Sequence, residues 1–194
     1  MKSKHLFIAL AAMMLLGATM PAQAQNKKKK AKPTATQVNI TVPGELGIYE
    51  LRGPVKECKW IKSYETVTYG FDTNGKWITK DGQRLTELYG NNIKRDSKGR
   101  ITMLGDVEEN TKYHYNANGL ITKFEQHFMD GGYEVSYTYN NNGECTKCVN
   151  KGSDMEGSFK NTVKFTILER DSYGNWTKRK DNQGGSETRT ITYY

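Results

Sequence analysis

Residues 113–122 read Tyr-His-Tyr-Asn-Ala-Asn-Gly-Leu-Ile-Thr, and this stretch carries the pattern that decides the fold. An Asp or Asn is followed three residues later by Gly, and an apolar residue stands two positions after the Gly. The pattern recurs around Gly75, Gly99, Gly143 and Gly174, where the chain reads FDTNGKW, RDSKGRI, YNNNGEC and RDSYGNW. Such repetition indicates one supersecondary unit copied along the chain.

Each copy predicts a β-hairpin turn, in which the short polar side chain caps the first position and Gly takes the left-handed conformation. The strands entering the turns alternate, and counting back from each Gly by four, six and eight residues gives an aromatic or apolar face in most copies. The first copy gives Phe71, Tyr69 and Val67, and the last gives Arg170, Leu168 and Thr166. Alternation of period two is typical of a sheet covered on one side.

The outgoing strands alternate less regularly, which predicts β-bulges there. The 12 Tyr residues favour strands, and the absence of a 3.6-residue apolar period argues against any helix of consequence. We therefore expect an all-β fold of consecutive antiparallel β-hairpin repeats forming a curved sheet or partial shell. A last strand over residues 188–194 could close or cap this sheet.

The amino-terminal residues have the three regions of a secretory signal. Lys2 and Lys4 precede an apolar run over residues 6–16, and Ala22-Gln23-Ala24 has the small-residue pattern of a cleavage site. We expect a signal peptide over residues 1–24, no lipid anchor and no stable membrane insertion. The predicted location is the periplasm, the cell surface or the extracellular space.

Residues 25–42 are expected to form a basic disordered linker, and residues 43–194 the β-hairpin repeat domain. Seven of the 29 basic residues lie in the signal and linker, which leaves 22 basic against 21 acidic residues in the domain. The net charge of +8 therefore belongs to the tail, and it does not indicate a nucleic-acid partner. The tail is either a solvated spacer or a contact to anionic cell-surface polymer.

The repeats resemble the tyrosine-aspartate (YD) repeat of Rhs and teneurin-type proteins, whose consensus runs Tyr-x-Tyr-Asp-x-x-Gly-x-Leu-Thr. The copies at residues 113–122, 137–146 and 69–78 carry the resemblance best. It implies a shell of β-hairpins, but the chain is too short for the closed, cargo-holding shell of the large members. With its signal and the stretch Leu51-Arg52-Gly53-Pro54-Val55-Lys56, the chain is similar to small exported proteins of Bacteroidetes bacteria.

Catalytic and metal-binding patterns are weak. Cys145 and Cys148 form a C-x-x-C after a predicted turn, without the second pair or the helix that zinc or redox sites use. One disulfide is the ordinary expectation for an exported chain, and Cys58 is a possible partner for either. His114 is predicted to be a surface residue. Carboxylates such as Glu125 form no recognisable catalytic pair of the glycosidase kind. We expect no enzyme activity, no metal and no cofactor.

Trp77 and Trp176 occupy the same position of the repeat, and Trp60 precedes the first copy. If that position faces outward, the three rings form platforms for sugars, and the protein is a glycan or cell-wall-binding module. The competing interpretation makes Trp77, Trp176 and their counterparts one buried layer of the core. Our main hypothesis is an exported, non-catalytic scaffold or binding protein that engages a protein or cell-envelope partner through its sheet face or return loops. A secreted hydrolase is a further alternative, and it requires a perturbed acid in a cleft near residues 151–157.

Overall fold

The computed structural model describes residues 41–155 and 157–194. The expected signal peptide and nearly all of the expected linker lie outside these residues. Val42, the last residue of the expected linker, is buried, and its N–H donates to the Asn118 carbonyl at 2.8 Å. Among the described residues, no helix is long and apolar enough to cross a membrane.

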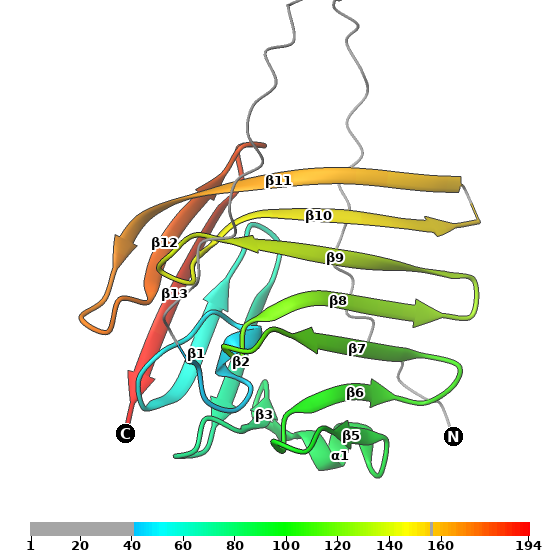
Figure 1. Ribbon diagram of the computed structural model, residues 1–194, viewed down its shortest axis with the longest axis horizontal. Helices are drawn as coiled ribbons and strands as arrows, with labels where there is room; N and C mark the ends of the chain where they lie inside the picture. Colours follow the sequence, from blue (N-terminus) through cyan, green and yellow to red (C-terminus); the bar gives the residue numbers. More distant parts are fainter. Residues whose placement is uncertain (1–40, 156) are drawn as a thin grey trace, which may run out of the picture. The chain divides into compact units, whose positions relative to one another are not determined.

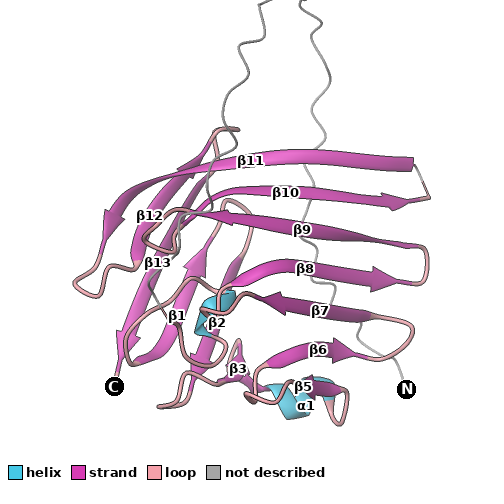
Figure 2. Ribbon diagram, in the orientation of Figure 1, coloured by secondary structure: helices cyan, strands magenta, loops and turns pink. Residues whose placement is uncertain are grey.

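The fold is all-β, with one antiparallel sheet built from consecutive hairpins (Figures 1 and 2). Its strands are β1 (Val55–Ile61), β2 (Thr66–Phe71), β3 (Trp77–Lys80), β4 (Gln83–Arg84), β5 (Ile93–Arg95), β6 (Ile101–Gly105), β7 (Asn110–Tyr115), β8 (Ile121–Phe128), β9 (Gly131–Tyr139), β10 (Cys145–Asp154), β11 (Gly157–Arg170), β12 (Trp176–Asp181) and β13 (Ser186–Tyr193). Two short helical elements accompany them, η1 (Leu46–Ile48) and α1 (Leu85–Tyr89). The α1 helix, at 5 residues, was not predicted.

The 13 strands follow the order β4-β3-β2-β1-β13-β12-β11-β10-β9-β8-β7-β6-β5. From β5 to β13 each strand pairs with the next one along the chain, and β1 then pairs with β13. The last strand therefore lies inside the sheet and joins the two ends of the domain. The sheet is open, with β4 and β5 as its edges.

The Asp/Asn-x-x-Gly turns have the predicted geometry. In the third copy, the Asn116 side-chain oxygen accepts the N–H groups of Asn118 and Leu120, both at 3.0 Å, and Gly119 has a φ of 85°. The same two hydrogen bonds recur in the other four copies. A sixth turn at Asp181 and Gly184 escaped the sequence pattern, because Ser186 stands where the other copies have an apolar residue.

A β-bulge follows each of the five predicted turns, in the outgoing strand as expected. The pairing skips the residue three positions after the Gly, which is Ile78 in the first copy and Thr102, Thr122, Thr146 and Thr177 in the others. Two of these threonines donate their hydroxyl to a carbonyl of the preceding strand, Thr122 to His114 at 3.1 Å and Thr146 to Thr138 at 3.2 Å. In these two copies the Thr hydroxyl therefore supplies a donor to a backbone carbonyl beside the bulge.

Residues 42–54, which we call the N-terminal plug, connect the turns of the five copies. Glu45 is fully buried, and its carboxylate accepts the N–H groups of Trp77 at 2.7 Å and Ile101 at 2.9 Å. Glu50 accepts the N–H of Cys145 at 2.8 Å. These N–H groups belong to the residues just before the bulges, where the strand pairing is interrupted. The two acidic side chains of the plug therefore supply the acceptors that the neighbouring strand does not offer.

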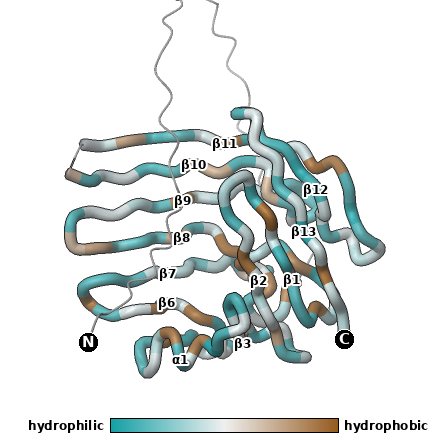
Figure 3. The backbone as a smooth tube through the Cα atoms, turned by 180° about the vertical axis from the view of Figure 1, so that it is seen from behind, coloured by the Kyte–Doolittle hydropathy of each residue, from teal (hydrophilic) through white to brown (hydrophobic). Residues whose placement is uncertain are grey.

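The faces of the sheet divide as the alternation predicted, with one exception. Phe71, Tyr69 and Val67 are buried, and Figure 3 shows apolar segments recurring along β1, β2 and β8. The exception is the last copy, where Leu168 is 46% exposed. The pairing of β11 with β12 skips Leu168, and this register shift changes the alternation in β11, so counting back from Gly174 was wrong.

Candidate functional site

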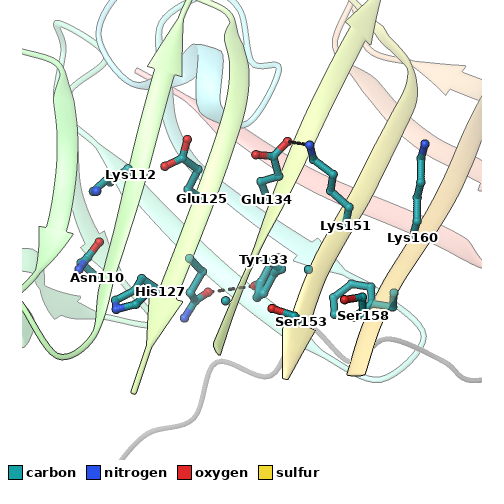
Figure 4. A pocket seen from close by; sticks show the side chains of 14 residues that line it. Asn110, Lys112, Glu125, His127, Tyr133, Glu134, Lys151, Ser153, Ser158 and Lys160 are labelled. Atoms are coloured by element: carbon teal, nitrogen blue, oxygen red, sulfur yellow. Dashed lines mark hydrogen bonds and ion pairs between the residues drawn. The ribbon is translucent and has the colours of Figure 1, made fainter. Parts of the chain in front are cut away.

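An open groove crosses the face of β7 to β11 opposite the core (Figure 4). We call this the outer groove; its volume is about 640 Å³. It lies near the β8–β9 and β10–β11 loops. The groove includes the start of the insert at residues 151–157, near which the hydrolase alternative requires a cleft.

The first wall of the outer groove is a row of charged residues in register across five strands. Because residues directly opposite on neighbouring strands share a face, their side chains stand side by side. Lys151 Nζ lies 2.9 Å from Glu134 Oε1, and Lys123 bonds to Glu125. The row consists of Lys112, Glu125, Glu134, Lys151 and Lys160.

The second wall is polar, contains no Lys, Arg, Asp or Glu side chain, and includes the exposed His127. Asn110 pairs with His127, and Ser153 pairs with Ser158, on either side of Gly132. Gly132 lies in the same row and has no side chain, so it leaves a gap in this wall. The second wall offers amide, imidazole and hydroxyl groups, and the first offers three ammonium groups and two carboxylates, so the groove suits a polar ligand.

Glu125 does not have the properties of a general acid. A hydrogen bond from Lys123 lowers the pKa of Glu125, and burial opposes this only in part. A lowered pKa keeps the carboxylate ionised, whereas a general acid needs a raised one. His114 is exposed, as predicted, and its Nε2 lies 3.2 Å from Glu125 Oε1. Within the described residues, no group of three or more His, Cys, Asp or Glu side chains is placed to hold a metal ion.

Of the three tryptophans singled out in the sequence, Trp77 and Trp176 belong to the interior, and Trp60 is half-buried. Trp77 is 4% exposed and Trp176 is 1% exposed, together with Ile101, Ile121 and Cys145 at the same repeat position. The buried-layer interpretation is therefore confirmed, and the outward-facing platforms are wrong. The apolar residue faces inward because it directly precedes the bulge and packs beneath the plug.

The structure brings two of the three tryptophans together. The rings of Trp60 and Trp176 are in edge contact at 5.6 Å between centroids. Trp77 packs elsewhere, against Tyr49 at 5.5 Å and Tyr69 at 5.7 Å. The three rings therefore form no continuous row.

Two buried arginines stack against Trp60 and Trp176. The Arg189 guanidinium carbon lies 3.4 Å from the Trp176 ring centroid and 4.5 Å from that of Trp60. Arg179 lies 4.0 Å from the Trp176 centroid. Cation–π contacts of this kind strengthen when the groups are removed from water.

The two arginines differ in their partners. Arg179 donates to Glu50 at 3.0 Å and to Glu187 at 2.8 Å. Burial alone would lower its pKa, but the two carboxylates outweigh burial and raise it. Arg189 is 4% exposed, and none of its three guanidinium nitrogens has a hydrogen-bond partner among the described residues. Burial lowers the pKa of Arg189 to about 10.

The three cysteines are free thiols, so the expected disulfide is not formed. Cys58 and Cys145 are buried, and Cys148 is half-buried. Burial raises the pKa of Cys148 to about 11, which disfavours the thiolate that redox or metal chemistry needs. These thiols therefore have the character of core residues.

Sequence reasoning missed the outer groove and the two arginines. The lysines and serines of the groove lie on different strands, and only the register brings them together. The available signals were the repeat position of Arg179, five residues after Gly174 as Leu104 is after Gly99, and the alternation of Arg189 with Ile191 and Tyr193. No protein-family model matches this chain, and no curated protein matches it.

Proposed function

We propose that this protein is an exported, non-catalytic β-hairpin repeat scaffold that binds a protein partner through its return loops. The amino-terminal residues supply the argument for export, since they combine basic residues, an apolar run and a small-residue cleavage pattern. The resemblance to YD repeats supports a repeat scaffold. Periplasm, cell surface and extracellular space all fit this proposal.

The observation that carries the proposal is an exposed apolar row at one end of the hairpins. Val107, Met129 and Met155 are 88%, 80% and 86% exposed. They stand in the loops β6–β7, β8–β9 and β10–β11, which lie side by side along the same end of the strands (Figure 1). We call these three residues the return-loop row.

The spacing of the return-loop row suits recognition by another protein. Successive loops are two strands apart, so their tips are separated by about 10 Å. Large apolar side chains that remain in water contribute no stability to the fold. When a partner covers them, the burial of each side chain contributes favourably to the free energy of binding. Methionine is also adaptable in shape, which makes it common on binding surfaces. The opposite end of the hairpins is covered by the N-terminal plug, so the loops are the end left free.

A triple variant, Val107→Ser/Met129→Ser/Met155→Ser, tests the proposal. The full chain and the variant are immobilised and exposed to envelope and secreted proteins of the source cells, and captured proteins are identified by mass spectrometry. The matched control, Ile61→Ser/Ile78→Ser/Leu168→Ser, alters half-exposed apolar residues on the strands. We expect one protein to bind the full chain and the control with the same affinity, and the loop variant at least tenfold more weakly. Equal binding by all three would contradict the proposal.

Neither alternative function gains support from the site. A sugar cannot stack on Trp77 or Trp176 as they are placed, because both rings are buried. A hydrolase would need an acid with a raised pKa in the outer groove, whereas the pKa of Glu125 is lowered. A silent screen against glycoside and peptide substrates is the expected result.

A further inference from the structure

We propose that the outer face of β10 to β12 binds an acidic polysaccharide. This surface, which we call the lysine face, is separate from the return-loop row, so the proposal does not depend on the protein partner proposed above. Its members are lysines whose side chains point away from the core: Lys147, Lys151, Lys160, Lys164 and Lys180.

The register places like charges directly opposite each other. Lys147 pairs with Lys164, and Lys151 pairs with Lys160, on the neighbouring strands β10 and β11. Cross-strand positions are about 5 Å apart, and like charges at that spacing destabilise a sheet. Lys180 adds a further positive charge on β12, opposite Thr166. An anionic ligand would remove this repulsion.

The lysine face has little internal compensation. Lys151 bonds to Glu134 at 2.9 Å, but Lys160, Lys164 and Lys180 have no ion pair among the described residues. These three side chains are exposed. In Figure 4 the Lys160 ammonium extends beside the groove without a partner, whereas a dashed line joins Lys151 to Glu134.

The surroundings favour a sugar polymer over a nucleic acid. The lysine face continues into the outer groove, where Ser153 and Ser158 present paired hydroxyl groups. Hydroxyls beside ammonium groups match a chain of sugars that carry carboxylates. Single-stranded nucleic acid would instead require exposed aromatic rings for base stacking. The residues that face outward along β10 and β11, from 147 to 153 and from 158 to 164, include no aromatic side chain.

The extent of the surface suits a linear polymer. From Lys147 to Ser153 the face follows β10 for six residues, which is about 20 Å. An acidic polysaccharide can therefore place several carboxylates along the strands at once. Individual exposed ion pairs are weak, and the combined set determines the affinity.

The test uses polygalacturonate, a polymer of carboxylated sugars, with the full chain. The basic tail would bind any polyanion, so Lys27, Lys28, Lys29, Lys30 and Lys32 are all replaced by Gln in every protein compared. In this background the face variant is Lys160→Gln/Lys164→Gln/Lys180→Gln. The matched control is Lys56→Gln/Lys76→Gln/Lys98→Gln, which removes the same charge from exposed lysines elsewhere.

We expect calorimetry at low salt to show binding by the parent and by the control. The face variant should bind about tenfold more weakly, since three surface ion pairs are removed. Neutral dextran should not bind, and added salt should weaken the interaction. Because the altered residues are exposed lysines, thermal melting should show all variants folded.

Three results would overturn the proposal. One is equal binding of polygalacturonate by the face variant and the control. Another is absence of binding by the parent. The third is binding of a single-stranded DNA oligonucleotide more tightly than polygalacturonate, which would assign the face to nucleic acid. The loop variant Val107→Ser/Met129→Ser/Met155→Ser should bind polygalacturonate normally, so this proposal and the preceding one can fail independently.

Discussion

Replacing Arg189 with methionine should make this protein more stable, although Arg189 is buried at the centre of the sheet. Its guanidinium has no hydrogen-bond partner among the described residues, and it stacks against the Trp60 and Trp176 rings. A buried charge without acceptors destabilises the folded state. Methionine fills a similar volume without the charge.

The magnitude follows from the pKa of Arg189, which burial lowers from 12.5 to about 10. A difference of this size corresponds to roughly 3 kcal/mol against the charged form in the folded state. The cation–π contacts of Arg189 offset about 1–2 kcal/mol of this cost, and the sulfur–aromatic contacts of methionine would replace a part of that stabilisation. We therefore expect Arg189→Met to raise the free energy of unfolding by about 1–2 kcal/mol, within the range known for replaced buried charges.

Arg179→Met is the matched control, because it removes the same side chain from a paired position. It leaves Glu50, which is 9% exposed, without its cationic partner. The expected loss is about 3–5 kcal/mol. Urea unfolding followed by far-ultraviolet circular dichroism measures both variants, since tryptophan fluorescence would change with the neighbouring side chain. If Arg189→Met lowers stability as much as Arg179→Met does, the reasoning is refuted, and Arg189 has an acceptor in solution.

Three other perturbations test the turns, the plug and the thiols. Glu45→Leu should lower the free energy of unfolding by about 3 kcal/mol or more, because two buried N–H groups lose their acceptor; an unchanged urea midpoint would contradict this. Gly119→Val should lower the melting temperature more than Gly99→Val. A Cβ added at Gly119 would lie 2.4 Å from the Val42 carbonyl oxygen, whereas one added at Gly99 meets nothing within 4 Å. Equal shifts in melting temperature would argue against docking of the plug on the Gly119 turn. The pKa of Cys148 is raised from 9.0 to about 11, so the unfolded chain loses this proton first and stability falls as pH rises from about 9 to 11. In chemical denaturation, the free energy of unfolding of Cys148→Ala should fall less steeply across that pH range. Identical slopes for the variant and the parent would exclude Cys148 as the source of the fall.

The repeat unit was predictable because its determinants are local. Asp or Asn, Gly and the recurrent Thr act within a few residues of one another, so the turn, the bulge and the inward apolar residue follow from one short pattern. The buried layer that includes Trp77 and Trp176 followed from the same spacing. Leu168 was misplaced because β11 contains register shifts that its own sequence does not reveal.

The parts that could not be predicted depend on contacts between distant residues. Glu45 and Glu50 have no local pattern, and their role is visible only when the plug meets N–H groups from other strands. The lysine face likewise required the register of β10 and β11. Period-two alternation assigns a side chain to a face but does not identify its neighbour.

The pairing of β1 with β13 has a consequence for the order in which the chain folds. The hairpins from β5 onward can each form from adjacent residues, but the plug and β1 need partners that come far later, as in the contact of Glu50 with Arg179 at a separation of 129 residues. Contacts so distant in sequence slow folding. The first strands must therefore wait for the last ones, and a chain emerging amino-terminus first stays incompletely folded until its carboxyl-terminal strand is available.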